Sequence, residues 1–291
     1  MKHLFLFLIA IILFQHSYSQ PSVHLNQSFK VLSWNIYMLP PLIKFTGKMS
    51  RANKIAEVLT KESYDMIVFQ EAFHSGARRR ILKGLKSIYP YAIGPANRIA
   101  GSFKTSSGVW ILSKTPITKL GSIKFTECYG FSDCQARKGA LMVETDWNGQ
   151  KIQVLGTHIQ AAGDKELKLR QVAELSEKLV IPNKKDGVPQ LLCGDFNLSD
   201  LDTNAQNRML ACCKAQNGLL SGDICYTKDI NGNNDLEPDN KNRKVLDYIL
   251  IRDNGKSILE TIRRVRIFES PWHRKHKDLS DHYAVEAEVR F

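Results

Sequence analysis

Apolar runs of strand length alternate with amphipathic segments of helical length from about residue 29 to the C-terminus, and this alternation limits the chain to an α/β fold. The expected strands are 29–37, 65–72, 107–114, 139–147, 151–159, 189–196, 244–252 and 283–291. The expected helices are 51–62, 77–89 and 164–180. No repeat, low-complexity stretch or Pro/Ser/Gly-rich linker divides the sequence, so one large domain accommodates it.

The N-terminus has the three-part layout of a secretory signal peptide. A basic start precedes an apolar stretch over 4–14, and the small residues Ser17 and Ser19 stand at cleavage-site spacing. The apolar stretch is short for a membrane span, although an uncleaved N-terminal anchor is the alternative. We therefore expect a signal peptide over 1–19, a single catalytic domain over 20–291, and a secreted or periplasmic protein without a transmembrane segment in the mature chain.

The six cysteines become candidates for disulfides if the chain is exported to an oxidising compartment. Cys128 and Cys134 are close enough to close a small loop, and either cysteine of 212–213 could reach Cys225. Cys193 lies inside an apolar strand, where a free core thiol is expected. None of the spacings resembles a zinc site, so structural zinc is not expected.

The formal net charge of +12 suggests a partner that carries phosphate. Nucleic acid, an anionic membrane surface and a phosphorylated small molecule all fit this charge, but excess Lys and Arg can also simply keep an exported protein soluble. The basic residues cluster at 77–80, 261–266 and 272–277. No cluster is interleaved with aromatic residues as a stacking platform for single-stranded nucleic acid requires.

Polar residues of the kinds that bind metals and transfer protons stand where the expected strands begin or end. They are Asn35, Glu71, His158, Asp195, Asn197, Asp247, Asp281 and His282. Each alone has a structural explanation, such as a turn cap for Asn35, an Asx-turn for Asp195 or a hydrogen-bonded core position for His158. Together they match one shared ligand site beyond the strand ends of an α/β sheet. Carboxylates and carboxamides suit a hard divalent cation, and two nearby histidines could transfer protons around neutral pH.

The segment 227–243 is rich in Asn, Asp and Gly and could be taken for a calcium loop. Its acidic spacing does not match an EF-hand, and no expected helices flank it. A flexible surface loop is therefore the favoured interpretation of this segment.

Seven ordered motifs resemble the endonuclease/exonuclease/phosphatase superfamily, which has the DNase I-like fold. They are LSWNIY, FQEAF, GVWILSK, GTHIQA, GDFNLSD, VLDYIL and LSDHYAV, and they extend from about Phe29 to the C-terminus. Three stretches resemble the secreted bacterial sphingomyelinase C branch most closely. These are QEAFHSGARRRILKGLKSIYPY, SGVWILSKTPI, and ARKGALMVE ahead of GTHIQA.

The resemblance implies a four-layer α/β sandwich of two mixed β-sheets flanked by helices, with a Mg2+-dependent phosphodiesterase site at one end. Mn2+ and Co2+ are alternative cations for such a site. On the matching motifs, Glu71 is implied as the main metal ligand, with Asn35 assisting and Asp281 supporting the metal side. His282 is implied as the general base, oriented by Asp247 of the LDY motif.

The remaining motif residues are implied to handle water, phosphate and the leaving group. Asp195 would position or activate the attacking water, and Asn197 would contact the phosphate. His158 would stabilise the charge on phosphorus or help the leaving group, and Lys138 matches a lysine expected near substrate phosphate. In-line displacement at a phosphodiester needs these functions: charge neutralisation, an oriented nucleophile and help for the leaving oxygen.

Some residues depart from the family pattern. Arg137 stands where an Asn is common before the Lys-Gly pair, so local substrate contacts are expected to differ. The dipeptide 74–75 is His-Ser where some bacterial relatives have Asp-Asn, which argues against a second, edge-bound cation. Those relatives carry an exposed aromatic hairpin that dips into membranes. Here the stretch 269–278 is short and basic with Trp272 as its only candidate wedge, so membrane contact is expected to rest on cationic attraction.

The sequence therefore predicts a secreted Mg2+-dependent phosphodiesterase that hydrolyses sphingomyelin or a similar phospho-sphingolipid to ceramide and a phosphorylated head group. The expected partner is the sphingolipid at a membrane surface, met by peripheral contact, and a monomer is the default. A secreted DNase I-like endonuclease is the first alternative, for which the positive charge is an argument, so nucleic acid stays open as a less favoured partner. A catalytically silent relative that binds lipid or protein is the second, although the motif residues that it would lack are all present.

Overall fold

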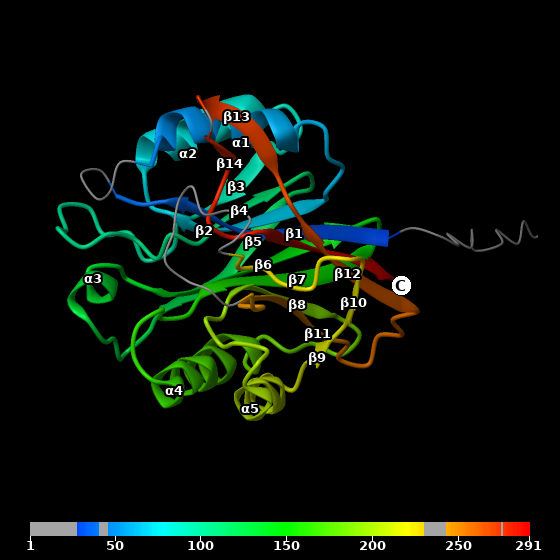
Figure 1. The fold of residues 1–291 in the computed structure, drawn as a ribbon. Helices are drawn as coiled ribbons and strands as arrows, with labels where there is room; N and C mark the ends of the chain where they lie inside the picture. Colours follow the sequence, from blue (N-terminus) through cyan, green and yellow to red (C-terminus); the bar gives the residue numbers. More distant parts are fainter. Residues whose placement is uncertain (1–27, 41–45, 230–242, 275) are drawn as a thin grey trace, which may run out of the picture.

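The structure, a computed structural model, describes residues 28–40, 46–229, 243–274 and 276–291. The signal peptide expected over 1–19 and most of the loop expected over 227–243 lie outside these residues. Two β-sheets lie face to face, and helices cover the outer face of each sheet (Figure 1). This arrangement confirms the predicted four-layer α/β sandwich. None of the helices in the described ranges is both long and apolar enough to cross a membrane.

The first sheet has seven strands in the order β10-β12-β15-β1-β2-β4-β3. Their bounds are β1 Ser28–Met38, β2 Met66–Ala72, β3 Tyr91–Ile93, β4 Trp110–Ser113, β10 Leu219–Ser221, β12 Glu260–Arg266 and β15 Ala284–Arg290. The central strand β1 runs parallel to β2 and antiparallel to β15. As a result, the C-terminal ends of β1 and β2 and the N-terminal end of β15 meet at one end of the sheet.

The second sheet has six strands in the order β5-β6-β7-β8-β11-β9. Their bounds are β5 Ile117–Lys124, β6 Gly139–Trp147, β7 Gln150–His158, β8 Gln190–Asp195, β9 Gln216–Asn217 and β11 Asp247–Arg252. Strands β7 and β8 are parallel, and β11 is antiparallel to β8, so that Asp247 lies opposite Asp195. The C-terminal ends of β7 and β8 therefore meet the N-terminal end of β11.

Helices α1 (Lys48–Leu59) and α2 (Ser75–Leu85) cover the first sheet, and α4 (Lys165–Leu175) and α5 (Thr203–Cys213) cover the second (Figure 1). A π-helical turn, η1 (Ser176–Val180), extends α4. The short helix α3 (Phe131–Cys134) lies apart from these layers, in the connection between β5 and β6.

The polar N-caps fix where two of the covering helices begin. Asp164 Oδ1 accepts a hydrogen bond from the Leu167 amide at 2.8 Å at the start of α4, and Asp202 does the same for Ala205 at the start of α5. Each bond satisfies an amide that has no partner within its own helix.

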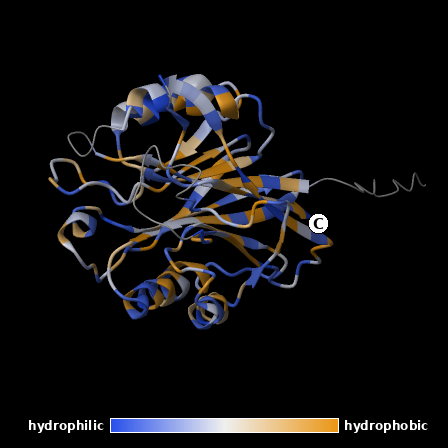
Figure 2. Ribbon diagram, in the orientation of Figure 1, coloured by the Kyte–Doolittle hydropathy of each residue, from blue (hydrophilic) through white to orange (hydrophobic). Residues whose placement is uncertain are grey.

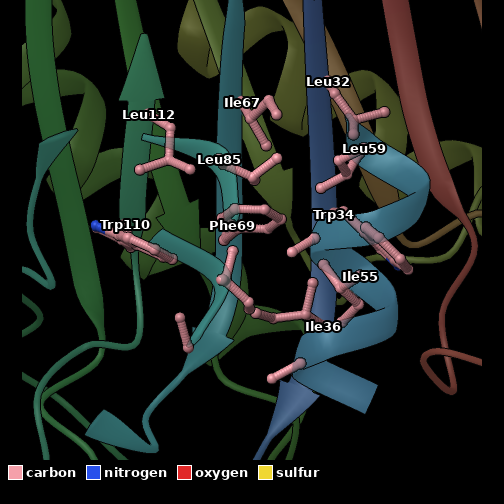
Figure 3. Packing of buried hydrophobic residues seen from close by; sticks show 14 of the residues in the cluster. Leu32, Trp34, Ile36, Ile55, Leu59, Ile67, Phe69, Leu85, Trp110 and Leu112 are labelled. Atoms are coloured by element: carbon pink, nitrogen blue, oxygen red, sulfur yellow. The ribbon is translucent and has the colours of Figure 1, made fainter. Parts of the chain in front are cut away.

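Strand β1 shows why the central strands are apolar on both faces. Phe29 and Val31 point between the two sheets, whereas Leu32, Trp34 and Ile36 point outwards under the helices. Figure 2 shows the hydrophobic residues concentrated in these layers. In Figure 3, side chains of α1 and α2 such as Ile55, Leu59 and Leu85 fill the space over the outer face of the first sheet. Complete burial of one such side chain contributes about 1.5–3 kcal/mol, so both interfaces stabilise the sandwich substantially.

Every strand and helix expected from the sequence is present, with shifts of a few residues at the ends. The longest such shift is at α2, which ends at Leu85 instead of residue 89. The longest elements that were not expected are β5, α5 and β12. The hairpin β13–β14 (Glu269–His273 and His276–Asp278) was expected only as a short basic stretch.

Among the described cysteines, the predicted Cys128–Cys134 disulfide is present. The predicted pairing of Cys225 with a cysteine of 212–213 is wrong, because all three are free thiols. Cys213 is fully buried in the apolar cluster between the second sheet and its helices, while Cys225 is exposed on a loop. Cys193 is a buried free thiol in β8, as expected.

Trp272 does not serve as an outward membrane wedge. Its ring packs against the core cluster beneath the hairpin and over Gly47, where any added Cβ would lie 2.1 Å from the ring. Its Nε1 donates a hydrogen bond of 2.8 Å to the Asp278 carbonyl oxygen. The hairpin is therefore attached to the fold by its only tryptophan.

Candidate active site

The polar residues predicted from the sequence converge at the end of the sandwich where β1, β2, β7 and β8 finish and where β11 and β15 begin, on the left of Figure 1. A cavity of about 270 Å³ opens there. It is lined by Glu71, His158, Ala161, Asp195, Asn197, Lys228, Lys244, Leu246, Asp281 and His282. The other three predicted residues, Asn35, Asp247 and Lys138, are buried behind this lining and hydrogen-bond to it.

Asn35 links the two sheets at the floor of the cavity. Its Nδ2 donates to Glu71 Oε1 and to Asp195 Oδ2, both at 3.1 Å. One carboxamide thus sets the separation between a carboxylate of the first sheet and a carboxylate of the second. The turn cap considered above is also present, because Asn35 Oδ1 accepts a hydrogen bond from the Tyr37 amide. Capping is therefore only part of the role of Asn35.

Glu71 combines an unusual backbone with an unpaired carboxylate oxygen. Its φ of 52° lies in the left-handed region, which non-glycine residues seldom occupy outside functional sites. The buried Oε2 has no hydrogen-bond partner among the described residues. Burial, with the Asp281 charge added, raises the pKa of Glu71 to about 7. A carboxylate held in this way has one oxygen left for a cation.

Asp281 lies on the same side of the cavity and is paired with a lysine. Lys228 Nζ is 2.6 Å from Asp281 Oδ2, and Ser280 Oγ lies 3.4 Å from Oδ1. Burial alone would raise the pKa of Asp281, but the Lys228 ammonium holds it below its usual value. Asp281 is therefore an anion that can hold positive charge at the cavity wall.

His282 and Asp247 form a hydrogen-bonded pair across the two sheets. His282 Nδ1 lies 2.8 Å from Asp247 Oδ2, and Trp34 Nε1 donates to the His282 carbonyl oxygen at 3.0 Å. The free Nε2 faces Asp195, with 3.8 Å to its Oδ2. Burial lowers the pKa of His282, but the surrounding carboxylates, Asp247 foremost, raise it to about 9 in the chain without a cation.

Asp195 and Asn197 reach the cavity by different means. Asp195 ends β8, while Asn197 lies beyond the strand with a φ of 51°, so strand alternation does not explain its direction. The Asn197 amide donates to Asp195 Oδ1 at 2.9 Å, which is the Asx-turn considered above, and Asp195 keeps Oδ2 for the cavity. Gly194 allows β8 to lie close to β7, because an added Cβ would be 2.2 Å from the Thr157 carbonyl oxygen.

His158 also lines the cavity, and unlike His282 it has a cation as its hydrogen-bond partner. Its Nε2 lies 3.1 Å from Lys138 Nζ, 3.7 Å from Asp195 Oδ2 and 3.9 Å from Glu71 Oε1. Burial and then the Lys138 charge hold the pKa of His158 well below its usual value. His158 is therefore a neutral ring that accepts a hydrogen bond from Lys138.

One further cluster has the spacing of a metal site. The ligand atoms of Asp195, Asp247 and His282 lie within 4.8 Å of one another. Asp247 Oδ2 is bonded to His282 Nδ1, while Asp247 Oδ1 and Glu71 Oε2 are both buried without a described hydrogen-bond partner. Of these two carboxylates, only Glu71 lines the cavity. The arrangement thus separates a proton-transfer pair from a carboxylate that is free to bind a cation.

Three residues of the site were not predicted. Lys228 and Lys244 line the cavity, and Asp133 holds Lys138 by an ion pair of 3.1 Å. Lys228 and Lys244 pair through their backbones. Lys228 falls inside the segment 227–243 that was interpreted as a surface loop, and Lys244 is the first residue of the expected strand 244–252. The closeness of Lys244 to the LDY motif is the only sequence signal that could have indicated any of these three residues.

The two departures from the family pattern have structural roles here. His74 Nδ1 accepts from the Ala77 amide at 3.2 Å and caps α2. Arg137 Nη2 donates to Ser102 Oγ at 3.1 Å, so this side chain joins two loops beside the cavity.

Comparisons with known proteins agree with the motifs. The model of the endonuclease/exonuclease/phosphatase family matches residues 32–282. A phospholipase C from Staphylococcus aureus is 27% identical, over 90% of this chain and 87% of that protein. A sphingomyelinase C from Leptospira interrogans is 28% identical over 91% of this chain, which spans 52% of that longer protein.

A crystal structure of a Staphylococcus aureus beta toxin double mutant with bound magnesium ions superposes on the fold with a TM-score of 0.80. It is 26% identical and matches over 90% of this chain and 99% of that one. The sequence resemblance and the predicted fold are thereby confirmed.

Proposed function

Because the chain belongs to the endonuclease/exonuclease/phosphatase family, we propose that it is a Mg2+-dependent phosphodiesterase that cleaves a phospho-sphingolipid, such as sphingomyelin, into ceramide and a phosphorylated head group. The observation that carries the proposal is one cavity in which the partly unpaired Glu71 carboxylate lies beside a His282–Asp247 pair. Similarity to the sphingomyelinase C of Leptospira interrogans supports the choice of substrate.

The residues on the Glu71 side fit a magnesium ion. Glu71 Oε2 is buried without a described partner, Asn35 and Asp281 offer further oxygen atoms, and this oxygen-only set is the kind that Mg2+ prefers. Mn2+ and Co2+ are alternative occupants. When bound, the ion would neutralise charge on the substrate phosphate. The magnesium ions in the solved beta toxin relative support this assignment.

The His282–Asp247 pair supplies proton transfer. His282 Nε2 faces the cavity and takes the proton of the attacking water, while Asp247 fixes the ring orientation and stabilises the imidazolium that forms. When no cation is bound, the carboxylates around the His282 ring raise the pKa of His282. Positive charge bound at those carboxylates opposes that rise and favours the form of His282 that accepts a proton.

The other residues act on water and phosphate. Asp195 Oδ2 lies between His282 and His158 and positions the water that attacks phosphorus as the bond from phosphorus to the ceramide oxygen breaks. Asn197 contacts a phosphate oxygen from the cavity wall. The Lys138 ammonium, held against His158 Nε2, stabilises the negative charge that builds up on the leaving ceramide oxygen, which takes up a proton from solvent as it departs.

We further propose that residues 1–19 are a cleaved signal peptide, that 20–291 form a single catalytic domain, and that the enzyme acts outside the cytoplasm as a monomer at a membrane surface. The basic and apolar N-terminal sequence supports export, and the net charge of +12 supports attraction to phosphate-bearing surfaces.

Purified protein should be incubated with vesicles that contain phospho-sphingolipids with different head groups and, separately, with plasmid DNA, each in Mg2+ or in EDTA. Magnesium-dependent release of the phosphorylated head group with intact plasmid is the expected result. Cleaved plasmid with intact lipid would instead establish the DNase I-like alternative. Absence of turnover on both substrates would leave the silent relative that binds lipid or protein.

A further inference from the structure

We propose that Phe103, Tyr129 and Phe131, together called the aromatic rim, dock the catalytic end of the molecule onto a lipid membrane. The proposal rests on the proposed function, because it adds to a lipid phosphodiesterase the surface by which its site reaches the substrate. It assigns membrane contact to loops beside the cavity instead of the hairpin that contains Trp272.

The rim side chains are exposed to an unusual degree. Phe103 is 104% exposed, Phe131 is 85% exposed and Tyr129 is 63% exposed, and Ile99 nearby is 54% exposed. Aromatic rings are large apolar surfaces that a soluble protein normally buries, and a contiguous exposed group of them marks an interaction surface.

The rim comes from two loops that are joined into one unit. The Thr105 amide donates to the Gln135 carbonyl oxygen at 2.9 Å, and the Arg137 amide donates to the Thr105 carbonyl oxygen at 3.2 Å. The Cys128–Cys134 disulfide closes the loop that presents Tyr129 and Phe131. Figure 1 shows this loop, with α3, and the β3–β4 connection at the same end of the molecule. The three rings are therefore offered by a tied support and not by separate loose loops.

The same support is continuous with the active site. Asp133 pairs with Lys138 and accepts hydrogen bonds from the amides of Ala161 at 2.9 Å and Ala162 at 3.0 Å. Ala161 lines the catalytic cavity, and Lys138 Nζ contacts His158. A membrane that met the rim would therefore lie beside the entrance through which a lipid phosphate must pass.

The charges around the rim select a lipid surface over an apolar protein partner. Arg98, Lys104 and Lys124 are exposed next to it, and no ion pair joins them to any described residue. The acidic residues of the same loops are already neutralised: Glu127 pairs with Arg170, and Asp133 pairs with Lys138. Aromatic rings beside unpaired cations suit the interface of a bilayer, where rings enter the head-group region and cations contact lipid phosphate.

Two other strongly exposed apolar side chains lie away from the cavity. Leu219 and Leu259 are 73% and 70% exposed, and they lie at the other end of the sheets, beside β10 and the start of β12 (Figure 1). They therefore provide matched controls, since their truncation removes similar exposed apolar area away from the cavity.

The test is binding of the mature protein to vesicles of sphingomyelin, phosphatidylcholine and phosphatidylglycerol, measured by sedimentation in EDTA so that hydrolysis does not contribute. The double variant Phe103→Ala/Phe131→Ala should bind at least about tenfold more weakly than wild type, because each removed ring loses its transfer from water into the interface. The control Leu219→Ala/Leu259→Ala should bind like wild type. The single variant Phe103→Trp keeps a ring suited to the interface and leaves Phe131 intact, so it should bind like wild type.

Unchanged binding of the Phe103→Ala/Phe131→Ala variant, with native circular dichroism, would overturn the proposal and leave the rim to a protein partner. Equal losses in the leucine control would overturn it as well. In Mg2+, the ratio of hydrolysis on vesicles to hydrolysis of detergent-dispersed lipid should fall about tenfold in the rim variant, in line with the loss of binding. Binding through the rim without hydrolysis of any lipid would reject the proposed function but retain the docking surface, so the two failures are distinguishable.

Discussion

Both histidines of the cavity approach Asp195 Oδ2, but they have opposite electrostatic surroundings. His282 has Asp247 as its hydrogen-bond partner and other carboxylates nearby, which raise its pKa to about 9. His158 has Lys138 as its partner, and burial together with that cation holds its pKa well below the usual value. The same residue type is thus made a strong base on one side and a neutral hydrogen-bonding group on the other.

This difference indicates that the two histidines have different chemical roles in the reaction. The His282 side is built to receive a proton, whereas the His158 side combines Lys138 with a neutral ring and suits developing negative charge. Asp195 lies between them, 3.8 Å from one ring and 3.7 Å from the other. Water is therefore expected to attack from the His282 side. The following variants test this assignment, and turnover in each is measured on the phospho-sphingolipid that the wild type hydrolyses.

The largest effect is expected for His282→Ala. Loss of a general base reduces turnover by about a hundredfold to ten-thousandfold, and the upper end is expected here because no other described histidine contacts Asp247. The fold should remain intact, which circular dichroism and thermal unfolding check. A folded variant with near wild-type activity would show that the mechanism is assigned wrongly.

A smaller loss, about a hundredfold, is expected for His158→Ala, because Lys138 still supplies positive charge on that side. The comparison of kcat between the two alanine variants tests this assignment of roles. If His158→Ala were the more damaging change, the two sides would have to exchange roles.

Asp247→Asn is expected to reduce kcat by about thirtyfold and to leave KM within a factor of about two, because Asp247 orients His282 and does not line the cavity. Asp247→Glu serves as the control, since a carboxylate retained at this position should recover part of the activity. A rise in KM with unchanged kcat would mean that Asp247 acts in substrate binding.

The main strands of the fold and eight of the site residues could be predicted for one physical reason. Strands buried on both faces give continuous apolar runs, as in β1 and β8, and polar residues at the ends of such runs stand out. Asn35, Glu71 and Asp195 were visible in this way. Their exact separation was not, because it depends on hydrogen bonds between two sheets.

The elements that were missed depend on partners far away in the sequence. Strand β12 was interpreted as a basic cluster, but Arg263 is buried and donates to the Gly218 carbonyl oxygen, while Arg266 pairs with Glu286 of β15. Lys228 likewise reaches Asp281 across a separation of 53 residues. Local composition cannot reveal that such a charge is satisfied by the tertiary structure.

The smallest effect is expected from removing the Cys128–Cys134 disulfide with serine at both positions, and it should be confined to the His158 side. The disulfide closes a short loop, so its removal costs about 2 kcal/mol of stability in the chain-entropy description. Asp133 precedes Cys134 and holds Lys138, so loosening this loop should weaken the support of Lys138 without reaching the His282–Asp247 pair.

Turnover should therefore fall only about twofold to fivefold in the disulfide variant, since the side chains of the site are all retained. Hydrogen exchange of the Ala161 and Ala162 amides, which donate to Asp133, should accelerate, whereas exchange of the His282 amide should stay as in wild type. Acceleration at both places would mean that the loop supports the whole cavity. The two histidine environments would then depend on one structural unit instead of two.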